Sequence, residues 1–411
     1  MTRDALSLSE ALWRGEISPE EVQPFSFWGD LVEVAPRIAF VPSFANVTAV
    51  ETPEGLVLID TGSPMFAQQI HDQVRSWSDA PLHTAVYTHG HIDHVFGVAA
   101  FEAEDGPETK VIAHAAVPER FRRYELTASY NSLINARQFL LDDLVWPTDY
   151  RYPDVTYEEA LDVVVGERTF ALTHGKGETD DATWVWMPDE KILCCGDFFI
   201  WASPNAGNPQ KAQRYPREWA HALRAMAELE AEVLLPGHGL PIMGAERVRA
   251  ALEDSAELLE SLVEQTIGMI NAGARLDAII HTVRAPEHLL AKPYLRPTYD
   301  EPEFVVRNIW RLYAGWYGGD PATLKPPCEG SVAAEVAALA GSPATLAKRA
   351  KELADTGDLR LAARLVEWAL IAAPKDDDVR ATHAEIFEAR AAAEPSTMAR
   401  GIFSWAAKRS R

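Results

Sequence analysis

One short segment of the chain, residues 89–94, contains three histidines and an aspartate within six positions. Imidazole nitrogens suit zinc, and a neighbouring carboxylate is usual in sites that hold two metals. His89 and His91 are alternate residues, so their side chains can turn towards one metal. Asp93 and His94 follow at the next turn, where they can serve a second metal. Two divalent metals held close together lower the pKa of bound water to about 7, so the chemistry expected here is hydrolysis.

The surrounding pattern indicates that a β-strand delivers this segment to the edge of a sheet. Residues 84–87 are β-rich and run directly into the histidines. The other predicted strands are residues 38–42, 47–50, 56–60, 111–114, 161–173, 183–187, 191–195 and 233–235, and the predicted helices are residues 5–15, a start at 18–21, 64–78, 118–145 and 216–231. Because β-rich and helical segments alternate twice, we predict a layered α/β body.

From about residue 245 onward the pattern is helical almost throughout. Residues 245–273 predict one long amphipathic helix, and the proline pair at 326–327 is typical of a domain boundary. A run at 357–374 is similar to one unit of a helical-hairpin repeat, and we interpret it as part of an α-helical interaction domain. We therefore predict two domains, residues 1–325 and 326–411, the first with a helical extension.

The composition restricts the kinds of partner. The chain has 411 residues, of which 47% are hydrophobic and 24% charged, and its formal net charge is -23 at pH 7. Such a chain can bury a sizeable core, and its charge argues against nucleic acid and anionic membrane surfaces as partners. No apolar run approaches the roughly 20 residues of a membrane span, and no secretory signal is visible, so the cytoplasm is the expected location. An anionic substrate would need cations close to the site.

The three cysteines predict no disulfide framework. Cys194 and Cys195 are adjacent and cannot easily bridge each other, and Cys328 leaves the number odd. Because free cysteine is among the most buried residue types, we expect the adjacent pair to be small core residues rather than metal ligands.

The pattern His-x-His-x-Asp-His after a strand resembles the signature of the metallo-β-lactamase superfamily. Asp60 in Asp-Thr-Gly resembles the aspartate that braces the metal loop of that family. Asp197 in Cys-Gly-Asp resembles the carboxylate that bridges both metals, and His238 in Pro-Gly-His-Gly resembles the last ligand. The resemblance covers residues 37–243 and implies an α/β fold, the αββα sandwich, followed here by an all-α C-terminal domain.

The motif before the bridging carboxylate differs from the common family pattern. Many members have Gly-His-Thr at this point, whereas this chain has Glu178 between Gly177 and Thr179. A glutamate ligand here resembles the zinc alkylsulfatases, the sodium dodecyl sulfate hydrolases. His174, four residues earlier, is the rival third ligand, and the frame of the motif favours Glu178. The alkylsulfatases usually carry a glutamate as the bridging carboxylate, where this chain has Asp197.

Two segments of the C-terminal half also resemble the alkylsulfatases. Residues 310–322 are similar to their segment W-R-x-Y-x-G-W-Y-D-G-N-P-A, although an aromatic run by itself would indicate core packing. Residues 357–374 resemble part of their helical dimerisation domain. The second resemblance implies a homodimer.

The resemblance implies a site with two Zn²⁺ ions per chain. Its ligands would be His89, His91 and Glu178 on one metal, Asp93, His94 and His238 on the other, and Asp197 as the bridge. Three carboxylates offset part of the charge of two dications, and we expect Asp93 and Asp197 to be catalytic residues as well as ligands. Asp60 would orient a ligand or the loop from outside the ligand set.

The implied reaction is hydrolysis of an alkyl sulfate to an alcohol and sulfate by a metal-activated water. Asn205, Lys211 and Arg214 are the nearest matches to the asparagine and arginine that grip the sulfate in the alkylsulfatases, and an ordinary solvated loop is the alternative. His114 or Tyr215 could protonate the departing alkoxide.

Two other reactions are compatible with a metal site on this fold. Hydrolysis of a lactone or thioester on the same two metals needs only a polarised carbonyl and no sulfate grip. Redox di-iron chemistry is disfavoured, because the members with that chemistry usually have glutamate where this chain has His91. In each hydrolytic reading the partner is a small-molecule ester.

Overall fold

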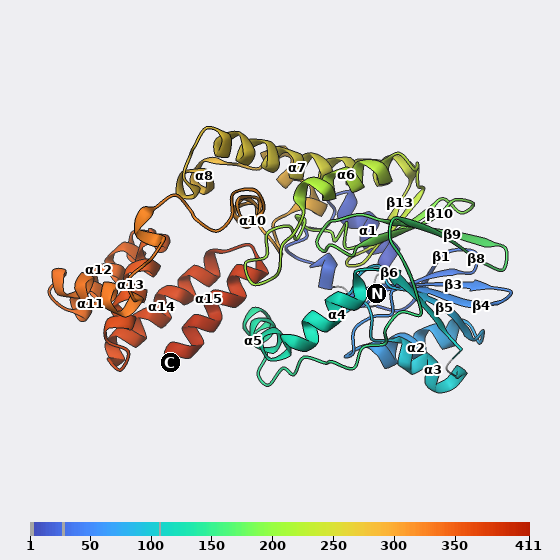
Figure 1. The fold of residues 1–411 in the computed structure, drawn as a ribbon, viewed down its shortest axis with the longest axis horizontal. Coiled ribbons are helices and arrows are strands. Elements are labelled where there is room, and N and C mark those ends of the chain that lie inside the picture. The colour runs from blue at the N-terminus through green and yellow to red at the C-terminus, as the bar shows by residue number, and fades with distance from the viewer. Residues whose placement is uncertain (1–3, 27–28, 107) are drawn as a thin grey trace. The chain divides into compact units, whose positions relative to one another are not determined.

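The structure is a computed structural model that describes residues 4–26, 29–106 and 108–411. Figure 1 labels its helices and strands along the chain. Residues 1–3, 27–28 and 107, which belong to the first predicted domain, lie outside the described residues.

The chain divides into two compact units. The first runs up to Ala128 and includes Pro147–Gly315, and the second consists of Ser129–Trp146 and Trp316–Arg411. The predicted boundary between residues 325 and 326 stays a prediction. The compact units change after Gly315, and the second unit also includes the internal segment Ser129–Trp146.

The first unit contains two mixed β-sheets, of which one has seven strands in chain order. These strands are β1 (Val32–Ala35), β2 (Ile38–Val41), β3 (Val47–Thr52), β4 (Gly55–Ile59), β5 (Leu82–Val86), β6 (Lys110–His114) and β7 (Val155–Tyr157). The strands from β1 to β4 pair antiparallel, and those from β4 to β7 pair in parallel. Because parallel strands share a direction, the carboxyl ends of β4, β5 and β6 lie at one edge, where ligands bind in open α/β sheets.

The other sheet has six strands, with the order β13-β12-β11-β10-β9-β8. Their bounds are β8 (Ala160–Val165), β9 (Arg168–His174), β10 (Thr183–Met187), β11 (Ile192–Gly196), β12 (Val233–Pro236) and β13 (Ile242–Met243). Only β11 and β12 pair in parallel among these described strands. The carboxyl ends of β11 and β12 therefore lie at the same edge of this sheet.

The two sheets pack face to face through one cluster of buried apolar side chains. Phe40, Val57 and Val86 contribute from the first sheet, and Phe170 and Val185 contribute from the second. β2 and β4 are buried along their whole length, which explains why they are continuous apolar runs rather than alternating patterns. Cys194 belongs to this cluster between the sheets, and Cys195 belongs to a second cluster of buried apolar side chains. Both are buried, as predicted for small core residues.

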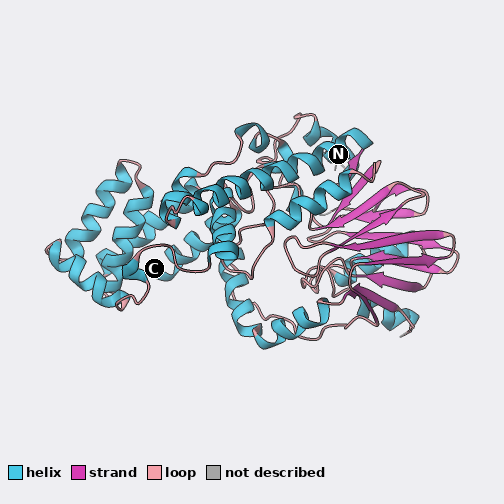
Figure 2. Ribbon diagram, turned by 45° about the horizontal axis from the view of Figure 1, so that its top comes forward, coloured by secondary structure: helices cyan, strands magenta, loops and turns pink. Residues whose placement is uncertain are grey.

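Helices cover the outer faces of both sheets (Figure 2). α2 (Ala67–Trp77) and α3 (Val98–Asp105) bury Ile70, Val74 and Phe101 against the first sheet. α6 (Pro216–Ala227) and α7 (Ala245–Asn271) pack on the second sheet. The layer order is therefore the predicted αββα sandwich.

Two predicted elements are shorter or more interrupted than the sequence pattern indicated. Residues 161–173 form the hairpin of β8 and β9, because Gly166 adopts a φ of 59° in the turn between them. Residues 118–145 form α4 (Val117–Leu126) and α5 (Ala128–Phe139). The second helix ends where Leu140 takes a φ of 55°, a left-handed conformation that a right-handed helix does not tolerate.

The first predicted helix is present as α1 (Ala5–Trp13), and its start is capped by the carboxylate of Asp4, which accepts the amide hydrogen of Ser7 at 2.8 Å. The helix start predicted at residues 18–21 is wrong. The hydroxyl of Ser18 accepts the amide hydrogen of Glu20 at 3.1 Å, so the segment forms a local turn instead. Serine side chains compete in this way with helical hydrogen bonds.

The helical extension of the first unit follows β13. The long helix predicted at residues 245–273 is α7, and it is followed by α8 (Leu276–Thr282), α9 (Glu287–Leu290) and α10 (Pro302–Ala314). None of the described helices is long and apolar enough to cross a membrane.

The second unit is helical in its C-terminal part. Its helices there are α11 (Glu329–Leu339), α12 (Pro343–Asp355), α13 (Leu359–Ala372), α14 (Asp377–Ala393) and α15 (Thr397–Ser410). The run predicted as one helical-hairpin unit, residues 357–374, corresponds to α13, which packs on both α12 and α14. The all-α prediction for this region is confirmed.

Candidate metal centre

The loops that follow β5, β9, β11 and β12 meet at one cluster of metal-ligating side chains. Their ligand atoms form three groups within 4.8 Å: His89, His94 and Asp197; Asp93, His94 and His238; and His91, Glu178 and Asp197. All of the residues predicted as ligands are therefore brought together, although they come from segments far apart in the sequence.

Asp197 lies at the centre of the cluster, with imidazoles on both sides of its carboxylate. Its Oδ1 is 3.4 Å from Nε2 of His94. Its Oδ2 is 3.5 Å from Nε2 of His89 and 3.5 Å from Nε2 of His238. A second carboxylate of the cluster, that of Asp93, is 3.3 Å from Nε2 of His238. Asp197 thus belongs to two of the three groups, which is the arrangement expected of a bridging carboxylate.

The donor set fits a metal. Nε2 of His94 and Oδ1 of Asp197 are buried, face each other, and have no hydrogen-bond partner among the described residues. Buried polar atoms are normally paired, because leaving one unpaired costs about 1–3 kcal/mol. A cation between them would satisfy both atoms, and a set of imidazoles and carboxylates suits zinc.

The charges of the cluster shift the pKa values of its members in opposite directions. Burial, reinforced by His94, lowers the pKa of His89 to about 4. Burial also disfavours the charged form of His94, but Asp197 and Asp60 outweigh it and raise the pKa of His94 well above its usual range. Burial opposes ionisation of Asp197, yet His238 and His94 outweigh burial and hold the pKa of Asp197 well below its usual range. The imidazoles around the buried carboxylate of Asp197 therefore stabilise its negative charge.

Asp60 orients two of the histidines from outside the cluster. Its carboxylate accepts hydrogen bonds from Nδ1 of His94 at 2.7 Å and from the amide and hydroxyl of Thr88 at 2.7 and 2.8 Å. The hydroxyl of Thr88 in turn lies 3.0 Å from Nδ1 of His89. Because Nδ1 of each ring is engaged in this way, Nε2 of each ring faces the cluster.

The turn that carries Asp60 packs tightly against the metal loop. Asp60 has a φ of 58°, and the next residue, Thr61, donates its amide hydrogen to the carbonyl oxygen of His94 at 2.8 Å. A Cβ atom at Gly97 would lie 1.9 Å from the carbonyl oxygen of Thr61. The close approach therefore requires glycine at the start of α3, and it holds the metal loop against the aspartate.

We expect replacement of Asp60 by alanine to lower metal affinity or activity by about 10–100-fold, because His94 and Thr88 lose their shared acceptor. Metal retention during dialysis against a chelator measures the effect. Asp72→Ala on the exposed face of α2 is the matched control and should retain metal like the wild-type protein. Unchanged retention in the Asp60 variant would contradict the orienting role.

Glu178, and not its rival His174, lies in the cluster. Oε1 of Glu178 is 3.9 Å from Nδ1 of His91. The ring of His174 stacks on the ring of His114 with centroids 3.7 Å apart, and its Nδ1 lies 2.9 Å from the carbonyl oxygen of Ala182. The ring of His174 is therefore occupied elsewhere, in agreement with the frame of the motif.

Two side chains of the segment at 205–215 contact Glu178. Nη2 of Arg214 lies 3.0 Å from Oε1 of Glu178, and Nδ2 of Asn205 donates to the same oxygen. Arg214 is only 2% exposed and Asn205 only 4%, so neither belongs to an ordinary solvated loop. Burial first, and Arg214 next, lowers the pKa of Lys211 to about 7, while carboxylates of the cluster oppose the change.

The two predicted proton donors do not belong to the three groups of the cluster. Nε2 of His114 is 2.9 Å from the carbonyl oxygen of Glu158, and its Nδ1 accepts the amide hydrogen of Ala116 at 3.2 Å. Tyr215 begins α6, and its amide donates to the carbonyl oxygen of Gly177 at 3.0 Å, next to the glutamate of the cluster. Burial raises the pKa of the Tyr215 phenol. The catalytic role of either residue stays a prediction.

The sequence interpretation did not include a buried ion pair that braces the metal loop. Nε of Arg120 donates to Oδ2 of Asp181 at 2.5 Å, and the same oxygen accepts the amide hydrogen of Gly90 at 3.2 Å. The signal was the position of Arg120 one helical turn from Val117 and Tyr124, on the buried side of α4. A charged residue on an apolar helix face needs a buried partner.

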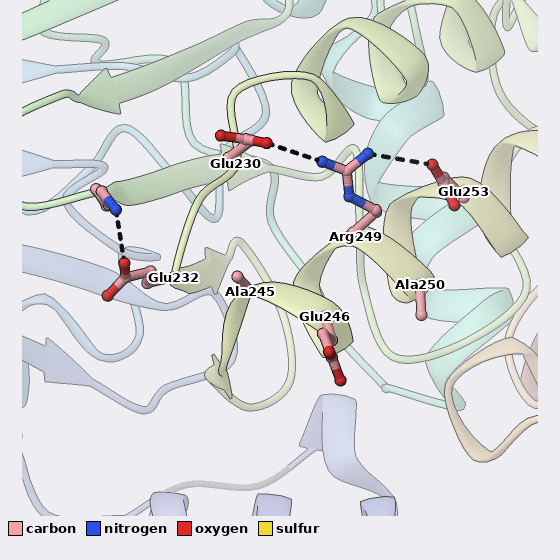
Figure 3. Close-up of a pocket in the computed structure, with 8 residues that line it drawn as sticks. Glu230, Glu232, Ala245, Glu246, Arg249, Ala250 and Glu253 are labelled. Carbon is pink, nitrogen blue, oxygen red and sulfur yellow. Dashed lines mark hydrogen bonds and ion pairs between the residues drawn. The ribbon is translucent and has the colours of Figure 1, made fainter.

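A surface hollow beside α7 is a separate feature (Figure 3). It is lined by Lys191, Glu230, Glu232, Ala245, Glu246, Arg249, Ala250 and Glu253. Its charged groups pair with one another, as in the 2.8 Å contact of Lys191 with Glu232 and the 3.5 Å contact of Arg249 with Glu230. It holds no predicted site residue, and we assign it no part in the chemistry.

Two parts of the chain match known protein families. Residues 41–238 match the metallo-beta-lactamase superfamily, and this range contains every residue of the cluster. This part of the chain is therefore similar to the metallo-beta-lactamase superfamily. Residues 275–411 match the alkyl sulfatase dimerisation family. The chain thus combines a region that matches the metallo-beta-lactamase superfamily with one that matches the alkyl sulfatase dimerisation family, as its motifs predicted.

The chain is similar to curated alkylsulfatases. It is 27% identical over 353 residues to a linear primary-alkylsulfatase of Pseudomonas sp. (strain ATCC 19151), which covers 78% of this chain and 65% of the relative. It is 29% identical over 395 residues to an (R)-specific secondary-alkylsulfatase of Pseudomonas sp., covering 87% of this chain and 59% of the relative. The chain thus spans less than two thirds of the length of these relatives.

A solved structure supports the fold over nearly the whole chain. The stereoselective inverting sec-alkylsulfatase Pisa1 from Pseudomonas sp. superposes with a TM-score of 0.85 at 24% identity. The match covers 93% of this chain and 65% of that one. It confirms the αββα sandwich followed by helices.

Proposed function

We propose that the protein is a two-zinc hydrolase that cleaves an alkyl sulfate into an alcohol and sulfate. The observation that carries this proposal is the pair of buried donors, Arg214 and Asn205, that contact Glu178 at the edge of the metal cluster. In a chain with a formal net charge of -23, they give an anionic ester a local cationic grip. A desolvated charge-assisted contact outweighs distant, screened charges. The similarity to proteins named alkylsulfatases supports the same reaction class.

Two of the three proximity groups, Asp93 with His94 and His238, and His91 with Glu178, support the ligand assignment. His89 is grouped with His94 and Asp197, and its Nε2 is also 2.8 Å from Nδ1 of His91. His89, His91 and Glu178 would hold one Zn²⁺, Asp93, His94 and His238 would hold the second, and Asp197 would serve as the carboxylate shared by both. The central position of Asp197 supports the bridge, and the three carboxylates offset much of the charge that two dications bring.

Residues of the chain bind the substrate and orient the ligands. When bound, the two metal ions supply a water that ionises near neutral pH. The guanidinium of Arg214 and the amide of Asn205 hold the sulfate oxygens, and Asp60 keeps the imidazole of His94 in one tautomer. As the new bond from water to sulfur forms, the bond from sulfur to the alkyl oxygen breaks, and that oxygen takes a proton.

Tyr215 is the better candidate for the proton donor. It follows Arg214 directly, its amide donates to the carbonyl oxygen of Gly177 beside Glu178, and its phenol is protonated at neutral pH. The alternative donor, His114, has both ring nitrogens engaged with backbone groups of Glu158 and Ala116. Asp93 and Asp197 act as catalytic ligands.

The protein forms a homodimer through its C-terminal helical region. The match of residues 275–411 to the alkyl sulfatase dimerisation family supports this proposal. The substrate is a small molecule, and a cytoplasmic location stays an expectation.

A metal determination combined with a substrate panel tests the proposed function. We expect zinc near two ions per chain, together with hydrolysis of dodecyl sulfate and little hydrolysis of lactones or thioesters. Lactone or thioester hydrolysis without sulfate release would favour the other ester chemistry on the same site. Iron together with NADH-linked oxygen consumption would overturn the hydrolase proposal.

A further inference from the structure

The segment at 205–215 is fastened by a residue of α10, far away in the sequence. Asn308 in that helix is 5% exposed. Its Nδ2 donates to the carbonyl oxygen of Arg214 at 3.0 Å. Its Oδ1 accepts from Nε2 of Gln213 at 2.9 Å and from Nη2 of Arg311 at 3.1 Å. Both polar atoms of this buried amide are satisfied, and a single helix residue holds two successive residues of the segment.

A second attachment lies at the other end of the same segment. The carboxylate of Asp300, which is fully buried, accepts the amide hydrogens of Gly207 and Glu301. A Cβ atom at Gly207 would lie 2.2 Å from the amide nitrogen of Val305, so the segment packs directly against the backbone of α10. The start and the end of the segment are therefore both fixed by residues 300–308.

These attachments matter for the orientation of Arg214. Its Nη1 donates to the carbonyl oxygen of Ala212 at 2.9 Å, and its Nη2 contacts Glu178. Its Nε is buried and has no hydrogen-bond partner among the described residues. A buried donor that the protein leaves unpaired is rare, and it is the kind of group that a bound anion pairs.

We infer that Asn308 and Asp300 are positioning residues, which hold the segment at 205–215 so that Arg214 and Asn205 meet the anionic group of the ester. The inference rests on the proposed function. Fixed donors stabilise developing charge efficiently because they need no reorganisation during the reaction. A displacement of about 1 Å can cost about 10²-fold in rate, even when the altered residue does not touch the substrate. Asn308 and Asp300 thus act through Arg214.

The positioning itself is tested by hydrogen–deuterium exchange on the full-length, zinc-loaded protein. Asn308→Ala should raise exchange in peptides that cover residues 205–215, and it should leave those covering residues 88–97 unchanged. Asn308→Asp keeps the size of the side chain and one acceptor, so it tests the lost donor if the alanine variant folds poorly. Ile309→Val, a buried change on the same helix, is the matched control for a general loss of stability. Unchanged exchange at 205–215 in both Asn308 variants would overturn the inference, whatever the substrate is.

The consequence for recognition is tested with dodecyl sulfate as substrate and inorganic sulfate as inhibitor. Asn308→Ala should lower kcat/KM by about 10²-fold and weaken sulfate inhibition, with the zinc content unchanged. In an Arg214→Ala background the same change should have less than about a twofold effect, because coupled residues are non-additive. Full additivity of the two changes would overturn the inference.

The two proposals fail in different ways. If the wild-type protein neither cleaves dodecyl sulfate nor binds sulfate, the proposed function fails, while increased exchange at 205–215 in the Asn308 variants would still support the positioning role. If the wild-type protein is active and the Asn308→Ala variant matches the Ile309→Val control in kcat/KM and sulfate inhibition, the positioning inference fails and the function stands.

Discussion

Replacing Glu178 with alanine should leave the protein folded and reduce its zinc content from about two ions per chain to about one. The reason is that Glu178 is the carboxylate nearest to Nδ1 of His91 and completes one of the three ligand groups. Activity should fall by more than the roughly 10–100-fold that changes outside the ligand set cost. Metal analysis after gel filtration and the initial rate with dodecyl sulfate measure both effects.

The matched control for that variant is His174→Ala. His174 stacks on His114 outside the cluster, so its loss should leave the zinc content unchanged. Glu178→Gln separates two roles of the carboxylate, because it keeps the size needed to contact Arg214 and Asn205 but is a poorer ligand. Loss of zinc from the His174 variant alone would show that the third ligand was wrongly assigned.

Replacing Arg214 with alanine should lower kcat/KM for dodecyl sulfate by about 10²–10³-fold, which is the range for removal of one fixed donor at a site of developing charge. The effect is large because Arg214 is buried, and water cannot replace its guanidinium easily. Arg214→Lys should recover only part of the rate, because an ammonium lacks the planar fork that matches two sulfate oxygens. Steady-state kinetics with matched zinc content measure this loss.

Arg217→Ala is the matched control for Arg214. Arg217 lies three residues further along, in the first turn of α6, and is exposed to solvent. It should behave like the wild-type protein, because exposed charges contribute little. Any lactone or thioester hydrolysis should be nearly insensitive to loss of Arg214. An equal fall for sulfate and carbonyl esters would contradict the role of Arg214 as an anion grip.

Much of the candidate site was predictable because its signals are local. The strand before the histidines, the metal loop, the turn at Asp60 and the residues Asp197 and His238 each lie in a short motif with recognisable types and spacing. Glu178 could be distinguished from His174 by the frame of its motif, and the geometry agrees. Element type was also predictable where the apolar pattern is clear, as in the continuous apolar runs of β2 and β4 and the helical spacing of apolar residues in α7. The spacing of apolar residues along the chain indicates which side of a segment is buried, and this spacing differs between strands and helices.

The element limits depended on single backbone conformations. The helical pattern across residues 118–145 does not reveal that Leu140 turns left-handed and ends α5, nor that Ser18 closes a turn. The compact units also join Ser129–Trp146 to the C-terminal helices across more than a hundred residues of sequence. A periodic pattern reports which face of a segment is buried, but it does not report what buries it.

By itself, the sequence predicted the layered fold, the family resemblance and the candidate ligands, because each depends on short motifs of residues that are neighbours along the chain. Only the tertiary structure decided how the donors are held. The amide of Asn308 reaches Arg214 across 94 positions, and Arg120 reaches Asp181 across 61. Buried polar groups are normally hydrogen-bonded, and their partners can lie far away in the sequence. The spacing of residues within a short motif therefore does not predict these contacts.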